Sequence, residues 1–93
     1  MNLTNSDVYI LRKMYRLPLE RFATLIGTDK AHINRIERGE RTLTKDMAER
    51  IANIFELTEN KMAKIRFDYE DYAVERQFAE QKANVNLGGE KTD

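Results

Sequence analysis

Apolar residues recur along this chain at intervals of three and four residues, which is the spacing of one face of an α-helix. Five stretches show this spacing, and no strand-like alternation continues for more than a few residues. The predicted helices cover about residues 6–16, 18–26, 29–38, 45–55 and 59–85. The pattern therefore predicts an all-α domain of five helices, with no internal repeat.

Capping residues and glycines mark the ends of these segments. The predicted N-terminal caps are Asn5 or Ser6 for the first helix, Thr44 for the fourth and Thr58 for the fifth. Pro18 suits the first position of the second helix. Gly27 and Gly39 follow the second and third helices, where a residue that tolerates positive φ is favoured.

The apolar faces of the five helices give the expected core. Its members are Val8, Leu11, Tyr15, Leu19, Phe22, Ala23, Ile26, Ile33, Ile36, Met47, Ile51, Ala52, Ile54, Phe55, Met62, Ile65, Tyr69 and Tyr72. The third helix contributes only Ile33 and Ile36, so most of its surface is expected to face outward.

The fifth helix carries a second apolar stripe, formed by Phe67, Val74, Phe78 and Val85. This stripe lies almost opposite the first one. We expect residues 66–85 to form a C-terminal helix that contacts a partner, most simply a second copy of the chain. The alternative is a bend after Ile65 that folds both stripes onto the bundle. The remaining residues, 86–93, carry two glycines without periodicity and are expected to be disordered.

Composition narrows the class of protein. The chain has 93 residues, which is one small domain, and it has no cysteine for a disulfide or a thiolate metal site. No apolar run approaches a membrane span, so the expected location is the cytoplasm, without membrane contact. The net charge is +0, but residues 1–54 carry ten Lys and Arg against seven Asp and Glu, and residues 55–93 carry six against nine. The N-terminal part is therefore basic, which favours nucleic-acid binding there.

The segment "LPLERFATLIGTDKAHINRIERGER" meets the requirements of a helix-turn-helix motif. Ala23 is small enough for two helices to cross, and Gly27 can adopt the left-handed turn four residues later. With Ile33 and the following "IERG", this segment resembles the lambda-repressor-like, Cro-type (XRE) helix-turn-helix family. The following "RTLTKDMAERIANIF" is similar to the loop and fourth helix of that family. The resemblance covers about residues 6–65 and implies a compact five-helix domain, residues 1–65, that binds operator DNA as a homodimer.

The resemblance also assigns roles to residues of the third helix. The positions that match base readers of the major groove are Lys30, Ala31, Asn34 and Arg35. The positions better placed for phosphates are His32, Arg38 and Arg41. The family pairs the acid at Glu37 with an arginine of the first helix, which matches Arg12, and this implies a bridge that orients the third helix.

Two positions depart from the family pattern. Pro18 and Leu19 stand where the family has a polar cap and a side chain that contacts a DNA phosphate. The loop after Gly39 lacks the proline that the family often has near Leu43. Both departures are expected to lower DNA affinity and to leave the fold unchanged.

Other classes of function are less well supported by the residues. No catalytic or metal-binding spacing accompanies the single histidine, so we expect no enzyme activity, no metal and no cofactor. The rival hypothesis is a protein-binding adaptor that uses the acidic C-terminal helix, with Phe67, Val74 and Phe78 as anchors. The sequence favours a small DNA-binding transcription regulator, such as a repressor of phage, mobile-element or antitoxin type. It does not give the operator, the effector or the direction of regulation.

Overall fold

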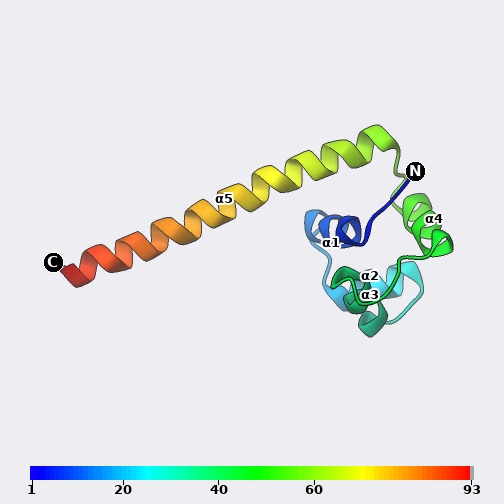
Figure 1. The fold of residues 1–93 in the computed structure, drawn as a ribbon, viewed down its shortest axis with the longest axis horizontal. Helices are drawn as coiled ribbons and strands as arrows, with labels where there is room; N and C mark the ends of the chain where they lie inside the picture. The colour runs from blue at the N-terminus through cyan, green and yellow to red at the C-terminus, as the bar shows by residue number, and fades with distance from the viewer. Residues whose placement is uncertain (93) are drawn as a thin grey trace.

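The computed structural model describes the backbone of residues 1–92 and the side chains of residues 1–81. Over residues 1–92 the backbone forms five helices and no strand, which confirms the predicted all-α class. The helices are α1 (Asn5–Met14), α2 (Leu19–Ile26), α3 (Lys30–Glu37), α4 (Lys45–Ile54) and α5 (Glu59–Thr92). The first four and the start of α5 form a bundle, in which α1 contacts α3 and α5 while α2 contacts α3 and α4 (Figure 1).

Most helix ends lie where the sequence predicts them, but the residue that caps the start of α1 differs from the prediction. Thr4, rather than Asn5 or Ser6, caps α1, because Thr4 and Asp7 exchange side-chain and backbone hydrogen bonds in a capping box. Pro18 is the residue before α2 rather than its first residue. Thr44 and Thr58 cap α4 and α5 as predicted, each accepting a bond from the backbone N–H three residues later.

The buried core follows the predicted apolar faces of the helices. Its buried apolar residues are Val8, Leu11, Phe22, Ala23, Ile26, Ile33, Ile36, Ile51, Phe55 and Met62. Tyr15, Ile54 and Tyr72 were predicted inside and are exposed. Tyr15 follows the last residue of α1, so its ring leaves the helix face and packs against Phe55 at 4.7 Å between centroids. Ile54 lies at the end of α4, and Tyr72 of α5 lies at the edge of the bundle, beside Lys13 of α1.

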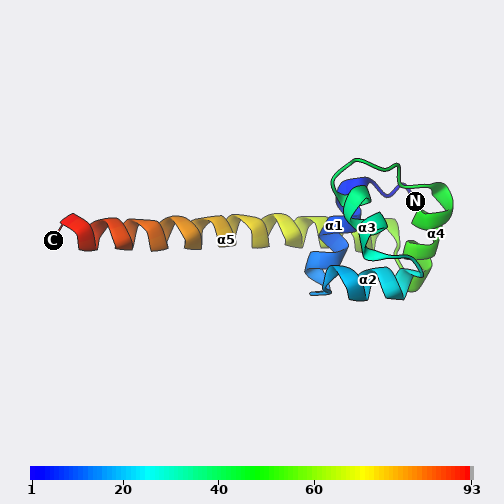
Figure 2. The ribbon, with the colours of Figure 1, turned by 90° about the horizontal axis from the view of Figure 1, so that it is seen from below.

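Helix α5 runs past α1 as one straight helix and extends far beyond the bundle (Figures 1 and 2). The predicted alternative, a bend after Ile65 that folds both stripes onto the bundle, is therefore not found. The helical backbone continues to Thr92, beyond the predicted end near Val85 and through residues 86–92, which were expected to be disordered. Glycine lowers helix stability by about 1 kcal/mol relative to alanine but can adopt helical angles, so Gly88 does not end the helix. Asp93, the last residue of the expected disordered tail, lies outside the described residues.

An ion pair between a buried carboxylate and a partly exposed guanidinium holds α5 against α1. The Asp7 carboxylate accepts hydrogen bonds from Nε and Nη2 of Arg66, both at 2.8 Å, and Asp7 is buried. Tyr9 and Tyr69 add an edge-to-face ring contact at 6.3 Å between the same two helices. These contacts fix the direction in which α5 leaves the bundle. The sequence analysis did not identify this pair.

The environment of Asp7 makes the pair sensitive to acid. Burial by itself raises the pKa of Asp7, but hydrogen bonds from the Arg66 side chain and the Thr4 backbone outweigh it. The pKa of Asp7 therefore lies below its usual value of 3.8 in the folded protein. A carboxylate with a lowered folded pKa stabilises the fold above its unfolded pKa, and this stabilisation is lost as the pH falls through the folded pKa.

We expect Asp7→Asn to lower the free energy of unfolding by about 2 kcal/mol at pH 7, because it removes a buried, charge-assisted pair. The difference between the two proteins should shrink below about pH 4, as Asp7 of the wild-type protein becomes protonated. Urea unfolding of both proteins from pH 7 to pH 3 measures this difference. A difference that stays constant over the whole range would show that the Asp7 charge does not contribute.

Candidate nucleic-acid interface

The turn between α2 and α3 has the geometry that a helix-turn-helix requires. Gly27 ends α2 in the left-handed conformation, at φ 90° and ψ 35°. The N–H groups of Gly27 and Thr28 both donate to the Ala23 carbonyl at 2.9 Å, which closes the end of α2. Ala23 is buried where α2 packs on α3. A side chain at position 27 would be strained at this positive φ, so glycine is needed at the turn.

Two contacts and a cap set the orientation of α3. Asp29 caps the helix by accepting a hydrogen bond from the His32 N–H at 2.9 Å. Ile33 and Ile36 are fully buried and anchor one side of α3 to the core. The Asp29 carboxylate is thus used in the cap.

The predicted base readers share the side of α3 that faces away from the core. Helical spacing places Lys30, Ala31, Asn34 and Arg35 on neighbouring positions of one face, and Lys30, Ala31 and Arg35 are exposed. We call these four residues the outer face of α3. Asn34 is half-buried, so it is less exposed to solvent than Lys30 and Arg35 are. The outer face therefore combines two cations, one amide and one methyl group on a single short helix.

The three predicted phosphate-binding residues differ in their exposure and in their partners. Arg41 is exposed in the loop after α3. Arg38 is exposed as well, but its Nε pairs with Glu40 at 2.8 Å, so a phosphate would have to compete with that carboxylate. His32 is half-buried and lies on the side of α3 away from the outer face.

A second ion pair ties α3 to α1. Arg12 donates to both carboxylate oxygens of Glu37, from Nε at 2.7 Å and from Nη2 at 3.1 Å. The side chains are only 15% and 6% exposed, and Arg12 also donates to the Leu17 carbonyl at 3.2 Å. The bond to Glu37 raises the pKa of Arg12 despite its burial. The structure thus contains the pair that the family resemblance implied.

Two further polar side chains support the motif: Asn5, which was predicted as a helix cap, and Arg50, for which the sequence predicts no role. The Asn5 amide donates to the carbonyls of Ile36 and Arg41, at 2.8 and 2.7 Å, and so fastens the loop after α3 to α1. The Arg50 Nη1 donates to the Ile26 carbonyl at 3.2 Å, at the end of α2 beside the turn. Neither contact has a local sequence signal, because the partners lie at least 24 residues apart.

The start of α2 is the position where the sequence departs from the family pattern. Pro18 precedes the helix, and the helix has no side-chain cap there. Because proline has no side-chain hydrogen-bond acceptor, Pro18 leaves the N–H groups of the first turn of α2 without a side-chain cap. They can still attract a phosphate through the helix dipole, but no side chain at Pro18 or Leu19 can add a hydrogen bond.

No group of three or more His, Cys, Asp or Glu side chains among the described residues is placed to hold a metal ion. No helix in the described part of the chain is both long and apolar enough to cross a membrane. The outer face of α3 is therefore the strongest candidate for a functional surface in the bundle.

Comparison with known proteins agrees with this geometry. Residues 8–61 match the model of the helix-turn-helix family, and this range contains α2, the turn and α3. The searches of curated proteins and of solved structures found no match.

Proposed function

The chain belongs to the lambda-repressor-like (XRE) helix-turn-helix family of DNA-binding regulators, and from this we propose that it represses transcription by sequence-specific binding in the major groove. The proposal places α3 in the groove and two copies of the chain on a two-fold symmetric site. A role as a small regulator of phage, mobile-element or antitoxin type is consistent with one domain of this size.

The observation that carries the proposal is the outer face of α3. The helix has one side anchored by Ile33 and Ile36 and the other side exposed to solvent. The cap at Asp29 and the bridge from Arg12 to Glu37 hold the helix at both ends. Side chains on a rigid helix can meet base edges with a fixed geometry, which specific recognition requires.

The chemistry of the outer face suits base edges. Arg35 and Lys30 can donate to O6 and N7 of guanine, and the Asn34 amide can form a paired contact with adenine. The Ala31 methyl group can contact the methyl group of thymine. Arg38, Arg41 and His32 are proposed to contact phosphates, which position the protein on any sequence alike.

The distribution of charge supports this orientation. Residues 1–54 carry the basic excess of the chain, while the part of α5 after Arg66, residues 67–92, carries six acidic residues and three basic ones. Helices α3 and α5 lie on opposite sides of α1, so this acidic part of α5 is directed away from the proposed DNA surface (Figure 1). A chain with zero net charge can therefore still present a basic surface to DNA.

Selection of bound DNA from a random pool, followed by sizing of the complex, tests the proposal. The expected result is a palindromic motif that binds two chains, with half-sites one helical turn apart. The affinity should also fall steeply with salt, because phosphate contacts release counterions. No enrichment of any sequence, together with binding that salt does not weaken, would contradict the proposal.

Two arginines should respond differently to substitution by alanine. We expect Arg35→Ala to weaken binding of the selected site by about 1–3 kcal/mol and to relax preference at one base position. We expect Arg41→Ala to weaken all sequences by a similar factor, because a phosphate contact carries no base information. Binding assays with the selected site and its single-base variants measure both effects. Identical base preferences for Arg35→Ala and the wild-type protein would remove Arg35 from the base readers.

A further inference from the structure

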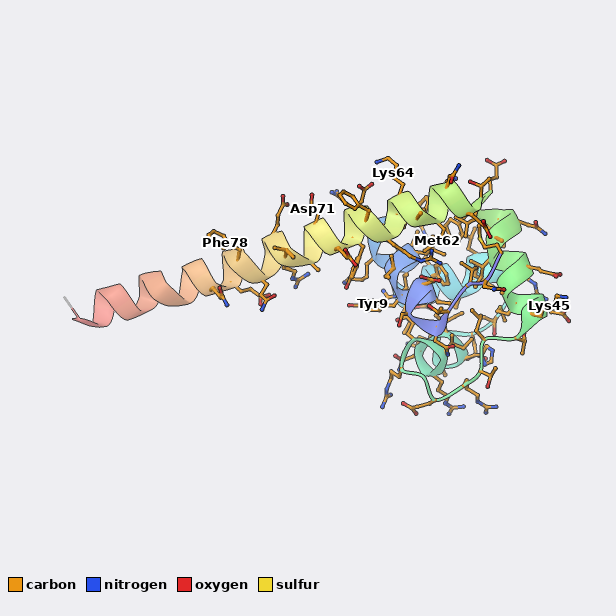
Figure 3. All side chains as sticks on the ribbon, turned by 45° about the horizontal axis from the view of Figure 1, so that its top comes forward. Tyr9, Lys45, Met62, Lys64, Asp71 and Phe78 are labelled. Atoms are coloured by element: carbon orange, nitrogen blue, oxygen red, sulfur yellow. The ribbon has the colours of Figure 1, made fainter. Side chains whose placement is uncertain are left out.

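The face of α5 that is turned away from the bundle carries an apolar surface that no other described residue covers. We call Phe67, Val74 and Phe78 the α5 stripe, and their exposed fractions are 68%, 65% and 66%. On the opposite side of the same helix, Met62 is fully buried against the bundle. Phe78 lies well outside the bundle (Figure 3). Large apolar side chains aligned on an exposed helix face mark an interaction surface.

Carboxylates border the α5 stripe. Helical spacing places Glu70, Asp71 and Glu75 within about 80° of the centre of the stripe. No ion pair involves these three carboxylates among residues 1–81. Over residues 67–81 there are five acidic residues and one basic residue. That basic residue, Arg76, lies on the far side of the helix, where it bonds Glu80 and the Tyr72 hydroxyl.

The carboxylates beside the α5 stripe decide between two possible partners, a second copy of α5 and a helix of another protein. A second copy of α5 would bring two sets of unpaired carboxylates together, and Asp71 would enter the contact in both copies. Like charges across an interface oppose association, and the three apolar side chains that each helix offers within residues 1–81 form only a short contact to offset them. A partner helix with a basic border would instead pair with Glu70, Asp71 and Glu75.

We propose that the α5 stripe binds an amphipathic helix of another protein, whose apolar face is bordered by Lys and Arg. The stripe supplies the apolar anchors, and the acidic border selects the charge of the partner. This inference does not depend on DNA binding, because α5 and α3 lie on opposite sides of α1 (Figure 1). A partner bound to α5 would leave the outer face of α3 accessible.

The full-length chain and two synthetic helical peptides test this proposal. The peptides are about 18 residues long and share one leucine face, which is bordered by Lys in one peptide and by Glu in the other. We expect fluorescence anisotropy to give the Lys peptide a Kd at least about ten-fold lower than that of the Glu peptide. The Kd of the Lys peptide should rise between about 50 and 300 mM NaCl.

Variants of the chain separate the two parts of the surface. We expect Phe67→Ser/Phe78→Ser to raise the Kd of the Lys peptide at least about ten-fold. The matched control, Leu25→Ser, changes an exposed apolar side chain of α2 and should leave the Kd unchanged. The triple variant Glu70→Lys/Asp71→Lys/Glu75→Lys should reverse the preference between the peptides. Circular dichroism checks that each variant keeps its helix content.

Three results would overturn the proposal. The first is equal binding of the two peptides, and the second is an unchanged Kd in folded Phe67→Ser/Phe78→Ser. The third is a wild-type dimer in sedimentation that becomes a monomer in this variant, because a second copy would then occupy the stripe. DNA affinity of the same variant is measured separately and should not change, so failure here is distinct from failure of the proposed DNA binding.

Discussion

Glu37→Ala is expected to lower the free energy of unfolding by about 3 kcal/mol, near the lower end of the cost of breaking a buried ion pair. The Glu37 side chain is almost fully buried and accepts two hydrogen bonds from Arg12. Alanine would leave the Arg12 guanidinium in the same site without its carboxylate. Arg12 keeps its bond to the Leu17 carbonyl, which places the expected loss at the lower end. Urea unfolding at pH 7 measures the change.

Two further variants control for this result. Arg12→Met/Glu37→Leu removes both charges, and we expect it to recover most of the stability, because an apolar pair can replace a buried ion pair. Glu40→Ala breaks the exposed pair with Arg38 and should change stability by less than about 0.5 kcal/mol. If Glu37→Ala unfolded at the same urea concentration as the wild-type protein, the pair would not stabilise the fold.

The same variants test whether the pair orients α3 on DNA. Glu37 does not belong to the outer face of α3, so its loss should weaken binding to all sequences without changing base preference. The double variant should be stable but should lack the bidentate geometry that fixes α3 relative to α1. Stability that is restored together with full DNA affinity would show that the pair acts only on folding.

The sequence predicted the elements of the fold that depend on local patterns. The spacing of Phe22, Ala23 and Ile26 identified the buried face of α2, and Gly27 identified the turn, because both depend on a few neighbouring residues. The spacing of Ile33 and Ile36 likewise predicted that the remaining surface of α3 faces outward. Whether its side chains contact bases remains a prediction, because no DNA is present to test it.

The contacts that sequence reasoning missed join residues that are far apart in the chain. Asp7 and Arg66 are separated by 59 residues, and charged residues make up 34% of the chain. With so many possible partners, only the packing of α5 on α1 selects this pair. Asn5 is similar, since it was predicted as a cap and instead holds the loop after α3. The Thr4 and Asp7 capping box was the one local signal that could have corrected the start of α1.

The stripe on α5 and the acidic character of this helix were both visible in the sequence, but the exposure of the stripe was not. Residue spacing placed Phe67, Val74 and Phe78 on one face, and the structure leaves this face uncovered. The spacing alone allowed a bend that would have buried them. Because α5 continues as one helix past the bundle, the stripe and its acidic border form a surface separate from the core.

Ile33→Ala is expected to lower the free energy of unfolding by about 2–5 kcal/mol, because it removes a fully buried side chain and leaves a cavity. A domain of this kind is stable by only about 5–15 kcal/mol, so part of the variant should be unfolded at 37 °C. Ile33 and Ile36 are the only buried apolar side chains of α3, and losing one of them also loosens the helix that carries the outer face.

The controls for Ile33→Ala separate loss of folding from loosening of α3. Ile33→Val keeps most of the volume and should cost only about 1 kcal/mol. Ile54→Ala removes an isoleucine that is 38% exposed at the end of α4, and it should cost less than Ile33→Ala.

DNA affinity is measured at a temperature where urea curves show every variant to be folded. An affinity of folded Ile33→Ala that remained equal to that of Ile54→Ala would show that this anchor supports folding but does not position α3. A weaker affinity for Ile33→Ala alone is the expected result, because side chains on a loosened helix meet base edges with less fixed geometry.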